Sequence, residues 1–131
     1  MSGGPLPEVD VTSAEFWSGL EHGELRLTRC DACGQASFPP LPTCPHCGSG
    51  QMHTVLGSGR GLLYSWVVVR IALDPEFEPD VPYTVVAVDL EEGGRMLGRL
   101  LGSAELEPGQ QMTFEVFSRD GVRLPGFRAA I

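Results

Sequence analysis

The first apolar pattern in the chain has helical spacing. Phe16, Trp17 and Leu20 recur along one face of a predicted helix over about residues 13–22, and Thr12 to Glu15 has the pattern of a capping box. Two interpretations remain open for this stripe. The helix either packs on the neighbouring region of the same chain, or it docks on another protein through Phe16, Trp17 and Leu20.

After Cys47, the pattern changes to short runs that are typical of strands. Glycine-rich turns separate these runs. Five strands of this kind favour a small closed barrel of the OB type. The predicted strands cover residues 62–71, 83–90, 95–101, 112–117 and a short stretch near 122–124.

The first of these strands is apolar on both alternating sets of positions. The run LLYSWVVVRI over residues 62–71 therefore predicts a strand that is covered on both sides. Before it, the glycine-rich segment 57–61 is interpreted as a flexible hinge that enters the barrel. After it, the acidic residues within 74–80 predict a solvated loop.

All four cysteines of the chain belong to one spacing pattern. Cys30 and Cys33 form one C-x-x-C pair, and Cys44 and Cys47 form a second pair after ten intervening residues. Two such turns supply the four thiolates that Zn²⁺ prefers in a tetrahedral site. The pattern predicts one structural zinc, with iron as the minor metal alternative. Because the protein supplies all four ligands, this metal is not expected to be catalytic.

Other interpretations of the cysteines are two disulfides or a redox pair. Two disulfides need an oxidising compartment, for which the sequence holds no signal, and a redox motif needs only one pair. Arg26 and Arg29 are expected to offset the negative charge of the metal site. His46 is expected to be an exposed residue rather than a ligand, and the barrel core is expected to be separate from the ribbon.

The charge balance narrows the possible functions. The chain has 17 acidic and 9 basic residues, and all the basic residues are arginine. The net charge of −8 disfavours nucleic-acid binding, which needs a basic footprint. The net charge is −5 over residues 1–24, +2 over 25–60 and −5 over 61–131. The positive stretch thus coincides with the cysteines, and no catalytic acid–base pair can be named.

The order of several motifs resembles a known family. The motifs are Phe16-Trp17-x-Gly-Leu, the two cysteine pairs each followed by glycine, Phe38-Pro-Pro, Gly59-Arg-Gly-x-Leu-Tyr-Ser, Pro82-Tyr-x-Val-Val and Leu124-Pro-x-Phe. In this order they resemble the zinc-ribbon OB-fold proteins of the DUF35 family. The resemblance implies a mainly β protein with an acidic leader and helical arm over 1–24, a rubredoxin-like zinc ribbon over 25–56 and a five-stranded OB-fold barrel over 57–131.

The resemblance also implies a role. Members of this family are non-catalytic accessory subunits that bind or guide acyl-CoA and stabilise a thiolase-like partner. That partner is a thiolase, a lipid-transfer-protein-type steroid side-chain aldolase or an acyltransferase, and it carries the catalytic residues. An α₂β₂ assembly is implied. Because no apolar run approaches the length of a membrane span and no secretory leader is visible, we expect a cytoplasmic protein.

A coenzyme A molecule carries several phosphate charges, so the net-positive stretch is the expected landing surface. The candidates are Arg60 for phosphate, with Phe38 and Tyr64 lining an apolar slot. One departure from the family weakens this expectation, because Leu41 stands where many relatives carry arginine. The alternatives from other classes are a module that binds single-stranded nucleic acid and a stand-alone enzyme.

Overall fold

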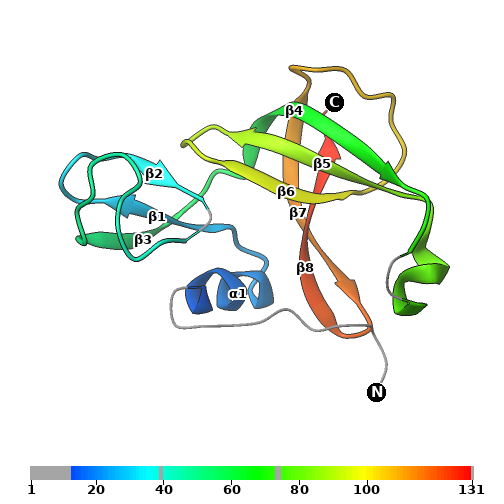
Figure 1. The fold of residues 1–131 in the computed structure, drawn as a ribbon, viewed down its shortest axis with the longest axis horizontal. Coiled ribbons are helices and arrows are strands. Elements are labelled where there is room, and N and C mark those ends of the chain that lie inside the picture. The colour runs from blue at the N-terminus through cyan, green and yellow to red at the C-terminus, as the bar shows by residue number, and fades with distance from the viewer. Residues whose placement is uncertain (1–12, 39, 73–74, 131) are drawn as a thin grey trace.

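The computed structural model describes residues 13–38, 40–72 and 75–130. A helix is followed by a small sheet and then by a barrel (Figure 1). The elements in order are α1 (Ala14–Glu21), β1 (Arg26–Cys30), β2 (Ala36–Ser37), β3 (Met52–Leu56), β4 (Arg60–Val69), the 3₁₀ helix η1 (Pro75–Asp80), β5 (Tyr83–Leu90), β6 (Arg95–Leu100), β7 (Gln111–Arg119) and β8 (Val122–Ala129).

Two sheets define the architecture. The small sheet has the antiparallel order β2-β1-β3, and the five later strands close into a barrel with the order β4-β5-β6-β8-β7. The barrel closes because β7 pairs back with β4, and its one parallel contact joins β6 to β8. The prediction of a mainly β protein with a helical arm, a ribbon and a five-stranded OB barrel is confirmed.

Two predicted boundaries change. Helix α1 begins at Ala14, with Ser13 at its N-cap, while Thr12 of the predicted capping box lies outside the described residues. Strand β8 is longer than the predicted short strand near 122–124. Its Pro125 and Gly126 are poor strand residues, yet they pair with β7 in the closed barrel.

A single core connects the helix, the small sheet and the barrel. Leu20 of α1 and Leu27 of β1 belong to the same buried cluster as Val86 and Phe127 of the barrel. Helix α1 contacts both β1 and β8, so it lies across the junction between the two sheets. The expectation of a separate barrel core was wrong, because the apolar face of α1 spans both parts.

Strand β4 is covered on one side only. Leu63 points into the barrel and is 2% exposed, whereas Leu62, Tyr64 and Val67 are 50%, 52% and 61% exposed. The prediction that both sides of this strand are covered by the chain is therefore wrong for the described residues. The physical reason is geometric: a strand of a closed barrel has one inner side, and only that side meets the core.

The segment between β3 and β4 is a hydrogen-bonded junction and not a free hinge. The Gly57 N–H donates to the carbonyl of Leu25, and the Gly59 carbonyl accepts from the N–H of Phe114. The Ser58 hydroxyl donates to Glu91 at 2.7 Å. These bonds connect the segment to the residue before β1, to β7 and to the turn after β5, so the flexible-hinge interpretation is corrected.

The predicted acidic loop is partly ordered as η1. Asp80 accepts hydrogen bonds from Arg99 and Arg119, each at 2.8 Å, and its side chain is 19% exposed. The expectation of a solvated loop is thus wrong for Asp80, because two guanidinium groups from the barrel hold it. Asp74 lies outside the described residues.

Candidate metal centre and neighbouring surfaces

The two cysteine turns have the same backbone geometry. The Gly34 N–H donates to the carbonyl of Cys30, and the Gly48 N–H donates to the carbonyl of Cys44. Both glycines have positive φ, 77° and 81°, which a residue with a side chain rarely adopts. The C-x-x-C-G sequence therefore determines a tight turn that presents two sulfurs on the same side.

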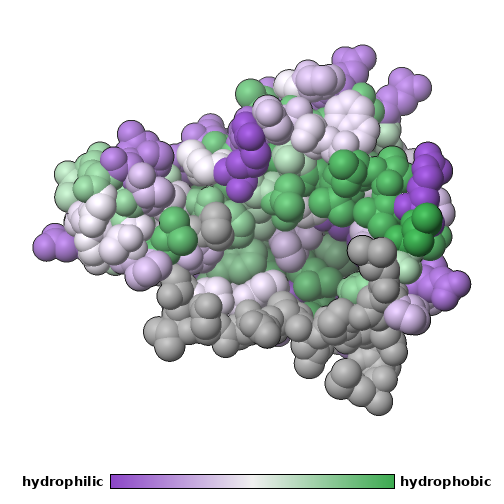
Figure 2. Space-filling model, viewed as in Figure 1, coloured by the Kyte–Doolittle hydropathy of each residue, from purple (hydrophilic) through white to green (hydrophobic). Residues whose placement is uncertain are grey.

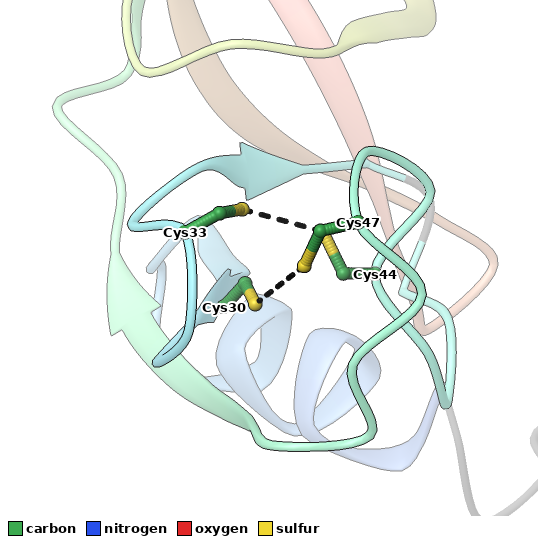
Figure 3. Close-up of side chains that lie close together, drawn as sticks. All are labelled: Cys30, Cys33, Cys44 and Cys47. Atoms are coloured by element: carbon green, nitrogen blue, oxygen red, sulfur yellow. Dashed lines mark hydrogen bonds between the residues drawn. The ribbon is translucent and has the colours of Figure 1, made fainter.

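The fold brings these two turns together. All four sulfurs lie within 4.8 Å of one another, with Cys30 to Cys47 and Cys33 to Cys44 both at 3.6 Å (Figure 3). Sulfurs around a tetrahedral zinc stand about 3.8 Å apart, given a Zn–S distance of about 2.3 Å. The four thiols thus fit a tetrahedral metal, and the separations are far too long for disulfides, in agreement with four free cysteines.

Backbone amides favour the thiolate form at two of the sulfurs. The N–H of Cys33 is the largest influence on Cys30 and lowers the pKa of that thiol to about 7. At Cys44, burial raises the pKa, but the N–H of His46, 3.3 Å from the sulfur, and other hydrogen bonds lower it overall. Hydrogen bonds to the charged form stabilise it, and metal ions bind the thiolate.

The side chains near the cysteines differ in part from expectation. His46 is exposed and contributes its backbone N–H, as an exposed turn residue does. Arg26 forms ion pairs with Glu15 and Glu24, at 3.1 and 2.8 Å, instead of serving the metal site. This corrects the expectation for Arg26, since two acidic residues of the helical arm pair with its guanidinium group.

The three acyl-CoA candidates are not brought into one slot. Phe38 packs at the helix, with its ring 5.1 Å from Phe16. Tyr64 lies on the outer side of β4 beneath Arg95, whose guanidinium carbon is 3.4 Å from the ring centroid. Of the three, Arg60 lines the cleft described next, and Phe38 and Tyr64 do not.

An open cleft of about 540 Å³ lies beside Arg60. It is formed by the start of β4, the end of β5 with Glu91, the start of β7 and Ala130 near the described end of the chain. Arg60 donates to Glu91 at 3.1 Å. The Ser58 hydroxyl, followed by this guanidinium, lowers the pKa of Glu91. The sequence held no local signal for this partner, because 31 residues separate the two.

The helical residues expected at a docking surface are mostly internal. Phe16 and Leu20 are 5% and 0% exposed, and Trp17 is half-buried with its ring edge-on to Phe16 at 5.1 Å. The first of the two interpretations therefore describes the structure, since the helix packs on its own chain. In this structure Phe16 and Leu20 are not available to a partner.

Sequence reasoning also missed a cluster that connects η1 to the barrel. Asp80 lies between two arginines, and Arg119 stacks over Phe77 at 4.2 Å while Arg99 stacks over Tyr83 at 4.1 Å. The acidic run was the only visible signal, and its basic partners lie up to 39 residues away. Within the described part of the chain, no helix has the length and apolar character needed to cross a membrane.

This geometry defines a class: a cysteine-rich ribbon joined through a shared core to an OB barrel. Residues 17–53 match the family described as the ChsH2 rubredoxin-like zinc ribbon domain, and residues 54–117 match the ChsH2 C-terminal OB-fold domain. The chain belongs to the zinc-ribbon OB-fold proteins of the DUF35 family, as the resemblance of its motifs predicted.

Three similar proteins place the chain within this family. A solved structure named "Ltp2-ChsH2(DUF35) aldolase" is 35% identical, with a TM-score of 0.84 over 96% of this chain and 100% of the other. A probable enoyl-CoA hydratase alpha subunit of Thermomonospora curvata is 35% identical over 97% of this chain and 40% of its own length. The benzoylsuccinyl-CoA thiolase subunit BbsA of Thauera aromatica is 35% identical over 60% of this chain and 53% of its own length.

The chain thus spans 40% and 53% of these two curated relatives.

Proposed function

We propose that this chain is a non-catalytic accessory subunit that stabilises a thiolase-like enzyme and guides its acyl-CoA substrate. The observation that carries the proposal is the likeness to the DUF35 chain of the Ltp2-ChsH2 aldolase, which this chain covers from end to end. Because the likeness covers the whole of that chain, we expect the surface that contacts the partner to lie on the helix, the ribbon or the barrel. The thiolase subunit among the relatives points to the same class of partner.

The metal site has a structural role in this proposal. Cys30, Cys33, Cys44 and Cys47 would hold one zinc with four thiolates, and this metal would join the two turns of the ribbon. Because the protein would supply all four ligands, this zinc is not expected to act as a Lewis acid on substrate. Catalysis accordingly belongs to the partner, and the isolated chain is expected not to turn over acyl-CoA.

The cleft beside Arg60 is the proposed place for the charged part of the acyl-CoA. Arg60 is exposed and is held in position by Glu91, and an arginine can make bidentate contacts to phosphate. Phe38 and Tyr64 lie elsewhere, so a role for either in acyl-CoA binding needs a contact outside this cleft. Arg60→Ala is expected to weaken acyl-CoA binding about tenfold, whereas Arg123→Ala, exposed on β8 outside the cleft, is expected to leave it unchanged.

Isothermal titration of an acyl-CoA, into the chain alone and into its complex with the partner, tests this binding. Heat with the complex that Arg60→Ala weakens and Arg123→Ala does not is the expected result. Absence of heat in both titrations would overturn the acyl-CoA part of the proposal.

Recovery of the partner tests the subunit role. The tagged full-length chain, expressed in its native host, is expected to co-purify with a thiolase-fold protein in about equal amount, at a mass that fits α₂β₂. Recovery of nothing, or of nucleic-acid-processing proteins alone, would overturn it. The nucleic-acid alternative is disfavoured by the net charge of −8, and because Arg95 and Arg99 on the barrel each pair with a carboxylate of the same chain.

A further inference from the structure

The outer surface of the barrel carries a group of large exposed apolar side chains. Leu62, Tyr64 and Val67 of β4 and Leu97 of β6 are between 50% and 64% exposed, and we refer to these four as the outer apolar face. Hydrophobic side chains gather in a band over β4, β5 and β6 in Figure 2. Soluble monomers rarely expose large contiguous apolar patches, and those that exist are often interaction sites.

The strand between β4 and β6 adds smaller apolar residues beside this face. On β5, Val85 stands opposite Val67, and Ala87 stands opposite Leu97. Residues directly opposite in antiparallel strands share a side of the sheet, so each apolar pair spans two strands. Ser65 of β4 completes the row of Ala87 and Leu97, and Arg99 of β6 completes the row of Val67 and Val85. The sequence of β4 is apolar on both sides, as in a strand that is buried on both. Among the described residues, only the barrel core covers it, on its inner side.

The charges bordering this face are already paired. Arg95 donates to Asp89 through two nitrogens, at 2.6 and 3.3 Å, while its guanidinium lies over the Tyr64 ring. Arg99, opposite Val85 on β6, donates to Asp80. Because carboxylates of the same chain occupy these guanidinium groups, the face suits an apolar protein surface better than a phosphate backbone.

Tyr64 has the properties of an interface anchor. It is half-exposed, and the stacked Arg95, itself fixed by Asp89, restrains its ring before any partner binds. Interface hot spots are enriched in tyrosine and arginine, and a side chain that is already ordered loses less entropy on binding.

We propose that the outer apolar face is the surface on which the thiolase-like partner docks; this inference rests on the proposed function. A second copy of this chain is a less suitable occupant, because a net charge of −8 on each copy opposes self-association. Phe16 and Leu20 of the α1 stripe are buried, which leaves only the half-buried Trp17 for a contact there and makes α1 the less suitable docking surface.

Paired surface substitutions test the docking face. Leu97→Asp alters the face, and Leu56→Asp on β3 of the ribbon is the matched control, because both leucines are 64% exposed. Tyr64→Ala removes the anchor. The tagged full-length variants are expressed in the native host, and the co-purified thiolase-fold protein is quantified by mass spectrometry. Circular dichroism and metal content establish that each variant is folded.

Leu97→Asp is expected to reduce the recovered partner at least about tenfold, Tyr64→Ala several-fold, and Leu56→Asp less than about twofold. Equal recovery with Leu97→Asp and the unaltered chain overturns the docking face alone. Equal losses of recovered partner with Leu97→Asp and Leu56→Asp also overturn the docking face. So does a dimer of the isolated chain that Leu97→Asp converts to a monomer. Recovery of no thiolase-fold protein with the unaltered chain overturns the proposed function and this inference together.

Discussion

The cysteine end of the ribbon and the barrel are organised by different forces. At the cysteine end, most of the turn residues are exposed, and the two turns meet through four sulfurs. In the barrel, every strand pairs with two others, and Val86, Val88 and Phe127 are completely buried. We therefore expect the ribbon end to depend on a bound metal for its geometry, while the barrel depends on strand closure and apolar packing.

The base of the ribbon differs from its cysteine end. Leu25 and Leu27 belong to the same core as the barrel, and α1 covers both. The boundary between the two modes of stabilisation thus runs through the ribbon itself rather than between the ribbon and the barrel. Four perturbations separate these two modes.

Loss of one cysteine is expected to have the largest effect. Cys44→Ser should reduce bound zinc from one equivalent to near zero, because it removes one of the four thiolates of the site and a serine hydroxyl does not replace it. Hydrogen exchange should become fast across residues 44–51 and stay slow in β5 to β8. Metal analysis and exchange mass spectrometry measure both. His46→Ala, at an exposed position between two of the cysteines, is the control that should keep the metal. A Cys44→Ser protein with stoichiometric zinc would contradict the ligand set.

Truncation of the helix tests whether the core is shared. Leu20→Ala removes a completely buried side chain and should lower the free energy of unfolding by about 2–5 kcal/mol. Because Leu20 belongs to the barrel's cluster, exchange should accelerate in the barrel strands as well as in α1. Leu56→Ala, at a position 64% exposed, should change stability by less than about 0.5 kcal/mol. Undiminished protection of the barrel in Leu20→Ala would mean that the two cores are independent.

Substitution of Asp80, the carboxylate between η1 and the barrel, should lower the free energy of unfolding moderately, by an amount that depends on pH. Asp80→Asn should cost about 1.5–3 kcal/mol at pH 7, the range for hydrogen bonds to charged groups. Hydrogen bonds from Arg119 and then from Arg99 lower the pKa of Asp80. The stabilisation is therefore complete above the ordinary carboxyl pKa of about 3.9 and is lost as the pH falls through the lower pKa of the folded state.

Urea unfolding of both proteins from pH 7 down to pH 2 measures this difference. The difference in free energy of unfolding between the unaltered protein and Asp80→Asn should be constant above about pH 5 and should become smaller toward pH 2. Asp89→Asn is the matched control, because its ion pair with Arg95 is about half-exposed on both sides. A loss of less than about 1 kcal/mol is expected there. A difference in free energy of unfolding that grows toward low pH would contradict this explanation.

Two glycine substitutions should show the smallest contrast. A Cβ at Gly61 would lie 2.5 Å from a methyl group of Val88 and 2.6 Å from the carbonyl of Asp89, so Gly61→Ala should destabilise the barrel by about 1–3 kcal/mol. At Gly50 in the ribbon, a Cβ would meet no atom within 4 Å. The melting temperature of Gly50→Ala should therefore be close to that of the unaltered protein. Equal shifts in the two variants would contradict the difference in packing between the two regions.

The sequence predicted those features that depend on neighbours along the chain. The C-x-x-C-G spacing determines each cysteine turn, because the two sulfurs and the positive φ of the glycine lie within five residues. Helical spacing and strand alternation located α1 and the five barrel strands for the same reason. The order of these motifs was sufficient to identify the DUF35 family.

Only the tertiary structure decided the features that depend on distant contacts. It paired Arg60 with Glu91 and Arg119 with Asp80, 31 and 39 residues apart, and it converted an expected hinge and loop into bonded segments. It also left one side of β4 exposed. Periodicity shows that a side chain is apolar, but whether it is covered depends on what the fold, or a partner, places against it.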